Sequence, residues 1–417
     1  MQPSYTRVKW ACYTASLSMS AVLNLSPMLF LTFRTQYGIS YTLLGLLVLI
    51  NFVTQLTVDL MFSFFSHKID MAKAVKLTPI LTVTGLLIYA VSPFLFPRAT
   101  YAGLVLGTVI FSAAGGFVEV LLTPVIAAIP AKDPDREISK LHSVYAWGTV
   151  GVVLISAAYL ALVGTAHWPW LALAWSIIPL ISVFLFWGAK IPHMDAPEKA
   201  SGICTQLKNR ALWGFFLTIF LAGAAECTMS QWASGYVEEA LGLPKIFGDV
   251  FGIAAFALAM GLGRTLYAKY GKSMETVLVL GGIGTTVCYL CATLVPSPIV
   301  GLLACGLTGF CVSMLWPGTI IVATEHIPTG GVFLFAMMAA GGDLGASVGP
   351  QLIGSITDAA IANPRLLVWA DALGLAPEQL GMKLGMLIAT LFPLAATAIF
   401  VGFLKKKQKK EIVAQKN

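Results

Sequence analysis

The sequence predicts an all-α integral membrane protein with twelve transmembrane helices, arranged as two pseudosymmetric halves of six helices each. Three observations lead to this fold class. The 417-residue chain is 58% hydrophobic and only 11% charged, which is far from the composition of a soluble domain. Its apolar stretches are about as long as the 20 or so residues that cross a hydrocarbon core. A polar interruption near the middle of the chain separates the first six stretches from the last six.

The twelve predicted spans follow one another with short connections, as a chain of this length requires. They cover residues 10–33, 41–66, 74–96, 100–129, 140–163, 168–189, 209–237, 247–268, 275–295, 299–325, 332–360 and 379–404. The central interruption, residues 190–208, is charged and contains two prolines, so we interpret it as a cytoplasmic linker. The predicted organisation is therefore a first half, a linker, a second half and a basic cytoplasmic tail, at residues 1–189, 190–208, 209–404 and 405–417.

The two halves repeat a short pattern in the same place. In the fourth span, six residues separate Gly116-Phe117 from Pro124, and in the tenth span six residues separate Gly309-Phe310 from Pro317. Transporters are often built from such duplicated halves, with the substrate site near the bilayer midplane where the halves meet.

Positive charge is unevenly distributed between the two sides of the predicted membrane. If the chain starts inside, the connections that face outward hold only five of the 26 Lys and Arg, namely Arg34, Arg98, Lys245, Arg365 and Lys383. The positive-inside rule then places both termini in the cytoplasm, here of a bacterial plasma membrane. The net charge of +7 thus indicates contact with the lipid bilayer, and we expect no nucleic-acid partner. We also expect a monomer, with no cofactor and no metal site.

Four carboxylates lie inside predicted spans: Asp59, Glu119, Glu226 and Asp343. An acid in a hydrocarbon layer is costly unless it faces a water-filled cavity or a partner, so each is a candidate functional residue. Twelve spans with interior acids indicate a protein that moves a solute across a membrane.

Helices 1 and 2 carry the first polar side chains. Asn24 offers an amide to a ligand, beside Pro27 in the first span. Asn51, Gln55 and Asp59 are spaced at i, i+4 and i+8, which puts them on one stripe of the second span. Because Asp59 lies only about seven residues from the cytoplasmic end, we assign this stripe to gating, with a structural pair or a ligand contact as alternatives.

In the fourth span, Glu119 lies about 11 residues from the cytoplasmic end, hence roughly 16 Å deep and near the midplane. Thr123 follows one turn later, and Pro124 removes a backbone donor. A carboxylate at this depth suits a proton carrier or an acceptor for a substrate hydroxyl group. The alternative is a packed polar contact between helices.

The second half offers a further set of candidates. Glu226, Gln231 and Trp232 lie within two turns and together supply the acceptors and the flat apolar face that a polyhydroxylated ligand needs; a cation would also fit. Trp316 is a candidate stacking platform for a ring. Asp343 lies among glycines that permit close helix approach, so it is either an inter-helix clamp or a ligand of the coupling ion. Glu226 is a further candidate for binding the coupling ion.

Basic residues are nearly absent from the spans. Lys76, Lys140, Arg210 and Lys383 stand within the first five residues of their spans and are assigned to the connections, which leaves Arg264, about four residues from the cytoplasmic end of the eighth span, as the only Lys or Arg that we take to be embedded in a span. A phosphate or carboxylate substrate would require a basic clamp at mid-depth, so the substrate should be neutral or cationic. Neither an HExxH nor a GxSxG motif is present, and we expect no catalytic residues and no enzymatic activity.

Twelve spans in two halves with a central loop resemble the major facilitator superfamily. That family carries a glycine-and-basic signature after helix 2 and again after helix 8. The second copy here is Gly263-Arg264 followed by Lys269-Tyr270-Gly271-Lys272, while the first, from Ser63 to Asp70, lacks the usual glycine and aspartate. The resemblance implies that Arg264 is a gating residue at a cytoplasmic helix end.

Within that superfamily, GGFVEVLLTPVIAAIP at 115–130 and LHSVYAWG at 141–148 resemble the fucose-permease-like sugar transporters. The resemblance implies sugar binding and proton coupling by the acid of helix 4, which is Glu119 here. That branch also uses an acid on helix 1, where this chain has only Asn24; Glu226 or Asp343 would then take that role.

Together these observations predict a secondary transporter that works by alternating access. We expect proton-coupled import of a neutral sugar or polyol, with sodium as the alternative coupling ion. The competing hypothesis is a proton-coupled exporter of cationic or lipophilic compounds.

Overall fold

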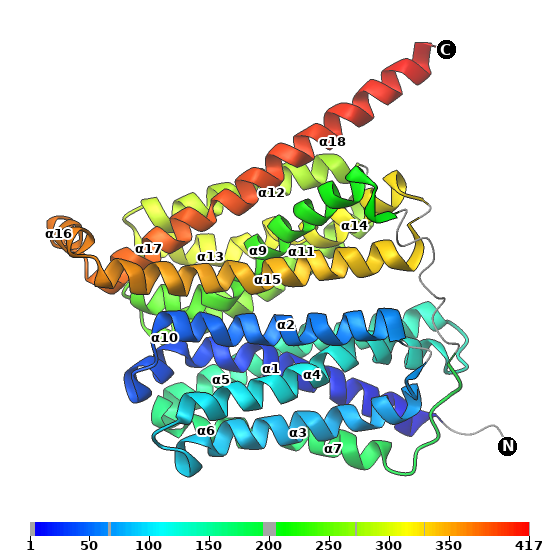
Figure 1. The fold of residues 1–417 in the computed structure, drawn as a ribbon, viewed down its shortest axis with the longest axis horizontal. Coiled ribbons are helices and arrows are strands. Elements are labelled where there is room, and N and C mark those ends of the chain that lie inside the picture. The colour runs from blue at the N-terminus through cyan, green and yellow to red at the C-terminus, as the bar shows by residue number, and fades with distance from the viewer. Residues whose placement is uncertain (1–4, 66–67, 195–205, 272, 329, 417) are drawn as a thin grey trace. The chain divides into compact units, whose positions relative to one another are not determined.

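The computed structural model describes the chain except for residues 1–4, 66–67, 195–205, 272, 329 and 417, so part of the predicted linker lies outside the described residues (Figure 1). Every regular element assigned within the described residues is helical, as the composition predicts. The chain divides into two compact units. One consists of Met1–Ile39 and Leu46–Ala200, and the other of Ser40–Gly45 and Ser201–Asn417.

The helices of the first half are long and closely follow the predicted spans. They are α1 (Thr6–Tyr37), α2 (Tyr41–Phe65), α3 (Met71–Leu95), α4 (Thr100–Ala127), α5 (Pro134–Val163), a short 3₁₀ turn (Thr165–His167), α6 (Trp168–Trp175) and α7 (Ile177–Phe186).

The helices of the second half include several interrupted ones. They are α9 (Arg210–Glu239), α10 (Lys245–Phe247), a π-helical segment (Gly248–Ala254), α11 (Ala255–Tyr270), α12 (Met274–Leu294), α13 (Pro298–Val312), α14 (Leu315–His326), α15 (Gly331–Ala362), α16 (Pro364–Ala372), α17 (Pro377–Ala389) and α18 (Leu391–Lys416).

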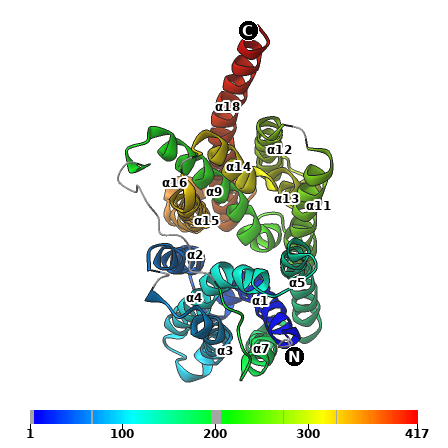
Figure 2. The ribbon, with the colours of Figure 1, turned by 90° about the vertical axis from the view of Figure 1, so that its right-hand side faces the viewer.

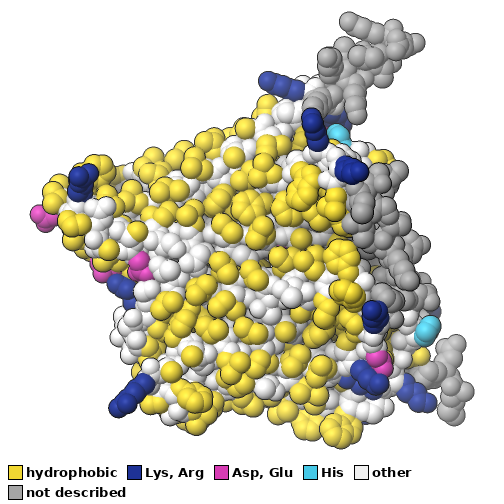
Figure 3. Space-filling model, viewed as in Figure 1, with side chains coloured by type: hydrophobic (Ala, Val, Ile, Leu, Met, Phe, Trp, Pro, Cys, Tyr) yellow, Lys and Arg dark blue, Asp and Glu magenta, His cyan; other side chains and the backbone are white. Residues whose placement is uncertain are grey.

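Eleven described helical segments are long and apolar enough to cross a membrane. α15, which corresponds to the predicted eleventh span, has 32 residues and is also long enough at 1.5 Å per residue. Hydrophobic side chains cover most of the face seen in Figure 3, and the Lys and Arg side chains lie mainly toward its edges. The prediction of an all-helical membrane protein is confirmed.

Three of the predicted spans are broken, and each break has a proline as its cause. The breaks fall at Ser176 between α6 and α7, at Met314 between α13 and α14, and at Thr390 between α17 and α18. Each of these residues stands three positions before a proline, which are Pro179, Pro317 and Pro393. Proline has no N–H to donate and its ring crowds the preceding turn, so the helical hydrogen-bond ladder is interrupted there.

In the first unit, α3 and α4 lie side by side and pack through small residues (Figure 2). A Cβ atom on Gly85 would lie 2.8 Å from the Gly107 carbonyl oxygen, so the two backbones approach closely. Tyr89, which is fully buried next to this contact, shares a 2.7 Å hydrogen bond with the Ser26 hydroxyl of α1. These contacts hold α4, which carries Glu119, against α3 and join α3 to α1, and α4 also packs against α1.

In the second unit, α15 packs along α9 in the same manner. A side chain on Gly345 would collide with the Phe220 carbonyl group, and one on Gly349 would come within 2.8 Å of the Ala224 carbonyl oxygen. The seam between α9 and α15 therefore depends on glycine, and it brings Glu226 and Asp343 onto neighbouring helices.

One helix was not expected from the sequence. The residues between α15 and α17 were interpreted as a loop, but they form α16, a nine-residue helix. Asn363 caps it by accepting a hydrogen bond from the Arg365 N–H, and Pro364 occupies the first turn, where its missing donor is not needed.

Candidate functional site

The polar stripe of α2 lies against α4 in the first unit. Asn51 and Gln55 are buried, with 8% and 3% of their surface exposed. The Ser112 hydroxyl of α4 donates to Asn51 Oδ1 at 2.5 Å, and Gln55 Nε2 donates to the same atom at 3.4 Å. A buried amide needs such partners, so these contacts fix the orientation of the two helices.

Further contacts show that α2 and α4 follow each other in register. A Cβ atom on Gly116 would lie 2.8 Å from Val58 Cβ. The rings of Phe62 and Phe117 meet edge to face, with centroids 5.5 Å apart. Residue numbers rise together along both helices, so the two run in the same direction.

Asp59 and Glu119 lie at matching levels of this contact and interact electrostatically. Glu119 is exposed in the structure, whereas Asp59 is half-buried. Among the described residues, the Asp59 Oδ1 atom is buried and has no hydrogen-bond partner. The structure thus brings together two acids that the sequence analysis assigned to different roles. Asn24 lies on α1 of the same unit, half-buried, where its Nδ2 donates to the Ser20 carbonyl oxygen at 2.8 Å.

In the second unit, charged side chains from three helices interact. Glu226 of α9 is half-buried and interacts electrostatically with Arg264 of α11. Asp343 of α15, only 6% exposed, acts together with Glu226 on the Cys227 thiol. One oxygen of Glu226, Oε2, is buried without a hydrogen-bond partner within the described part of the chain. The helices α9, α11 and α15 therefore carry a second set of charged side chains, which consists of the two acids and the basic residue predicted for this half.

Arg264 has a structural contact that the sequence analysis missed. Its Nε donates to the Ser313 carbonyl oxygen at 3.1 Å. In an unbroken helix, the N–H four residues later would donate to that carbonyl group, but residue 317 is proline. The guanidinium group thus replaces the donor that Pro317 lacks. Sequence could have provided this signal, because every interior proline leaves one carbonyl group without its usual partner.

This contact predicts a measurable effect on stability. Replacing Arg264 with leucine should lower the free energy of unfolding by about 1 kcal/mol, the usual net value of one hydrogen bond. Arg264→Gln, which retains a donor of different reach, should lose less. Thermal unfolding of the purified variants in detergent would measure both. Equal midpoints for Arg264→Leu and the unchanged protein would show that the Ser313 carbonyl group finds another donor.

The two candidate tryptophans differ in environment. Trp232 is fully buried, and its Nε1 donates to the Pro350 carbonyl oxygen at 2.8 Å, so in this structure it packs α9 against α15 rather than presenting a face to a ligand. Trp316 is half-buried, and one edge of its ring occupies the space that a side chain on Gly342 would fill. Gln231 is also half-buried. Trp316 and Gln231 therefore retain exposed surface, and Trp232 does not.

A buried ion pair in α10 and the π-helical segment was also missed. Lys245 Nζ lies 2.8 Å from Asp249 Oδ1, which also accepts a 2.5 Å hydrogen bond from the Ser234 hydroxyl of α9. Asp249 is only 1% exposed. The i, i+4 spacing of Lys245 and Asp249 was the available signal.

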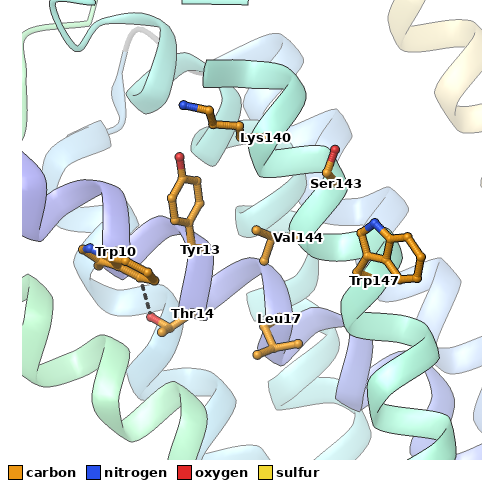
Figure 4. Close-up of a pocket in the computed structure, with 8 residues that line it drawn as sticks. All are labelled: Trp10, Tyr13, Thr14, Leu17, Lys140, Ser143, Val144 and Trp147. Atoms are coloured by element: carbon orange, nitrogen blue, oxygen red, sulfur yellow. Dashed lines mark hydrogen bonds between the residues drawn. The ribbon is translucent and has the colours of Figure 1, made fainter. Parts of the chain in front are cut away.

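A groove of about 450 Å³ lies between α1 and α5 (Figure 4). Its lining residues are Trp10, Tyr13, Thr14 and Leu17 of α1 with Lys140, Ser143, Val144 and Trp147 of α5. Next to it, Glu137 accepts hydrogen bonds from Lys9 at 3.0 Å and Lys140 at 2.6 Å. None of the predicted site residues lines this groove, whose wall is mainly aromatic and aliphatic.

Asp70, outside the spans, is the last residue of the eroded signature after α2. Its side chain caps α3 by accepting a hydrogen bond from the Lys73 N–H at 3.0 Å. This bond to the charged form holds the pKa of Asp70 below its usual range. Asp70 thus contributes to the start of α3. Within the described residues, no three His, Cys, Asp or Glu side chains are grouped so that they could hold a metal ion.

Comparison with solved structures shows which fold this is. A D-xylose–proton symporter matches with a TM-score of 0.67 and 15% identity, over 94% of this chain and 97% of that one. The E. coli fucose:proton symporter matches with a TM-score of 0.53 and 16% identity, over 94% and 99%. A nucleoside transporter matches with a TM-score of 0.68 and 13% identity, over 96% and 98%. At these identities the likeness concerns the fold.

No curated protein gives a significant sequence match. A family model does: the Major Facilitator Superfamily matches residues 11–350, which is most of the chain. Together with the helical fold and the nearly full-length structural matches, this shows that the chain belongs to the major facilitator superfamily and is a secondary transporter rather than an enzyme.

Proposed function

We propose that this transporter imports a neutral sugar or polyol together with protons, by alternating access between its halves. The observation that carries the proposal is the exposed carboxylate of Glu119 on the spanning helix α4. A charge at that depth requires water, a ligand or a proton. The same α2–α4 contact carries the neutral hydrogen-bonding groups Asn51, Gln55 and Ser112, and the acid Asp59 interacts electrostatically with Glu119.

The substrate class is supported by the chemistry of the side chains. Carboxylates, amides and a partly exposed indole are suited to hydroxyl groups and to the apolar face of a sugar ring. Arg264, the only span-embedded basic residue identified in the sequence, is engaged with the Ser313 carbonyl group and acts on Glu226. A free basic clamp for an anionic substrate is therefore not among the candidate residues. Two of the similar folds, at 15% and 16% identity, are proton symporters of xylose and fucose.

The roles that we propose for individual residues extend this assignment. Glu119 binds the coupling proton and a substrate hydroxyl group. The further cavity residues are Asn24, Glu226, Gln231 and Trp316. Asp343 is an alternative coupling residue. Arg264, Asn51 and Gln55 act in gating. Trp232 is left out of the cavity because it is fully buried. The positive-inside rule supports cytoplasmic termini, and the location that we propose is the plasma membrane of a bacterial cell.

The test is uptake by the purified protein in liposomes. A labelled panel of hexoses, deoxyhexoses and polyols would be offered with an inward proton gradient and again after the gradient is collapsed. We expect one sugar to accumulate only with the gradient, and a sodium gradient at constant pH to have no effect. Absence of uptake for every member of the panel, in folded and correctly oriented protein, would contradict the proposal.

An exporter of cationic or lipophilic compounds is the second candidate. The acids Glu226 and Asp343 in the second unit favour it, since both attract cations. The positive charge of Arg264 next to Glu226 weakens that attraction, which is why we place import of a neutral solute first. Comparing the drug sensitivity of cells that lack the protein with cells that overproduce it would separate the two, because an importer gives no protection.

A further inference from the structure

We propose that Asp59 and Glu119 act as one coupled pair of acids that holds a single proton, with Asp59 as the positioning residue for proton coupling at Glu119. The sequence analysis assigned Asp59 to gating, on the basis of its distance from the helix end. This inference rests on the proposed function of Glu119 in coupling and adds the residue through which its proton affinity is set.

The pairing follows from the register of α2 and α4. Asn51 meets Ser112, and a side chain on Gly115 would come within 3.3 Å of Gln55 Nε2. With the Val58–Gly116 and Phe62–Phe117 contacts included, the paired residues are separated by 55 to 61 positions in the sequence, and Asp59 and Glu119 by 60. Since both helices advance 1.5 Å per residue in the same direction, the two acids lie within about one helical turn of the same level.

The absence of a bulky side chain on α4 allows the two helices to come close at this point. Gly116, one turn before Glu119, sits against the Val58 side chain and within 3.2 Å of the Gln55 carbonyl oxygen, measured from the position a Cβ atom would take. Any larger residue at 116 would separate the helices. The electrostatic interaction between Asp59 and Glu119 is the result of this approach.

The two carboxyl groups differ in their access to water, which suits a shared proton. The Glu119 side chain is exposed, which leaves room for water to exchange a proton with it, while Asp59 is half-buried. Asp59 Oδ1 is buried and, among the described residues, accepts no hydrogen bond. Two ionised carboxylates that interact electrostatically repel each other, and one proton bound by the pair reduces the charge from two negatives to one. Release of that proton restores both charges, so the pair binds and releases one proton per cycle.

Several charged side chains on the neighbouring helices form ion pairs with residues other than Asp59 and Glu119. On α1 and α5, Lys9 and Lys140 bind Glu137, which also accepts from the Tyr13 hydroxyl. On α3, Lys73 binds Asp70, at 3.2 Å. The remaining titratable side chains that the structure describes on α1, α3, α4 and α5 are Arg7, Cys12, Arg34, Tyr37, Lys76, Tyr89, Tyr101, Arg136, His142, Tyr145 and Tyr159. Within the described part of the chain, Glu119 is the charged group that acts on Asp59.

The experiment reads protonation directly and needs no substrate. Infrared difference spectra of the protein in liposomes would be recorded over a range of pH, following the C=O band of protonated carboxyl groups. In Asp59→Asn, the band of Glu119 should disappear at a pH lower by about one unit, because the neighbouring negative charge is gone. Asp59→Glu, which keeps the charge, should leave the midpoint close to that of the unchanged protein. Asp343→Asn, which removes an acid from the other unit, should not move it.

The reciprocal variant keeps the inference testable if Asp59→Asn does not fold. Because the interaction is mutual, Glu119→Gln should shift the titration of Asp59 by the same amount and in the same direction. An unchanged midpoint in either folded variant would overturn the pairing. A shift with no uptake of any sugar would leave the pairing in place and reject the proposed substrate class instead, so the two failures are distinguishable.

Discussion

Replacement of Glu119 with glutamine is expected to abolish gradient-driven accumulation of the transported sugar, while exchange of labelled for unlabelled sugar continues. Glutamine has nearly the same shape and can still accept a hydrogen bond from a hydroxyl group, but it cannot bind and release a proton. The accumulation ratio across the liposome membrane should therefore fall to about one, whereas counterflow without a gradient should keep a rate of the same order as that of the unchanged protein.

Glu226→Gln is the matched control for this experiment. Glu226 is also a half-buried acid on a spanning helix, but it interacts with Arg264 in the second unit. If Glu119 carries the coupling proton, Glu226→Gln should change the apparent affinity for sugar and retain accumulation. The opposite result, with accumulation lost only in Glu226→Gln, would move the coupling site to the second unit. Loss of both accumulation and exchange in Glu119→Gln would show that Glu119 is needed for binding itself.

The second large effect is expected at the seam between α9 and α15. Gly345→Val should prevent normal packing of these helices, because its Cβ atom would collide with the Phe220 carbonyl group and lie 2.9 Å from the Ala224 nitrogen. Both obstacles are backbone atoms of a helix and cannot rotate away. Overpacking of this kind typically costs about 1–3 kcal/mol, and a collision with backbone belongs at the upper end. Thermal unfolding and the yield of monodisperse protein would measure the loss.

Gly261→Val provides the control within the same unit. Gly261 is also a helical glycine, in α11, but a Cβ atom there would meet no atom within 4 Å. The same chemical change should therefore leave the unfolding midpoint nearly unchanged. Similar losses in both variants would mean that valine is harmful for another reason, such as its effect on helix formation, and that the close approach at Gly345 is unimportant.

Much of the fold could be predicted because the relevant signals are local. A stretch of about 20 apolar residues must form a helix in a bilayer, since no water is available for its backbone groups. The three interrupted spans could not be singled out in this way: each break lies three residues before a proline, as Met314 does before Pro317, but Pro27, Pro79, Pro93, Pro124 and Pro350 lie inside unbroken helices. The short helix α16 was missed because its nine residues are too few to give a clear periodic signal.

The functional residues were only partly accessible in this way. The i, i+4 spacing put Asn51, Gln55 and Asp59 on one stripe, and in the structure Asn51 and Gln55 are buried and hydrogen-bonded. The spacing could not say which helix the stripe faces. For the same reason Trp232 seemed suited to a ligand, although its ring is enclosed and bound to the Pro350 carbonyl group.

The sequence by itself determined the helical membrane fold, the superfamily and the presence of acids inside the spans, because hydropathy, span length and motif spacing are properties of consecutive residues. Only the tertiary structure placed Asp59 beside Glu119 and Arg264 beside the Ser313 carbonyl group. Such contacts join helices far apart in the chain, and they depend on which faces pack together and at what register. That choice is made by glycines such as Gly116, whose missing side chains let two backbones approach.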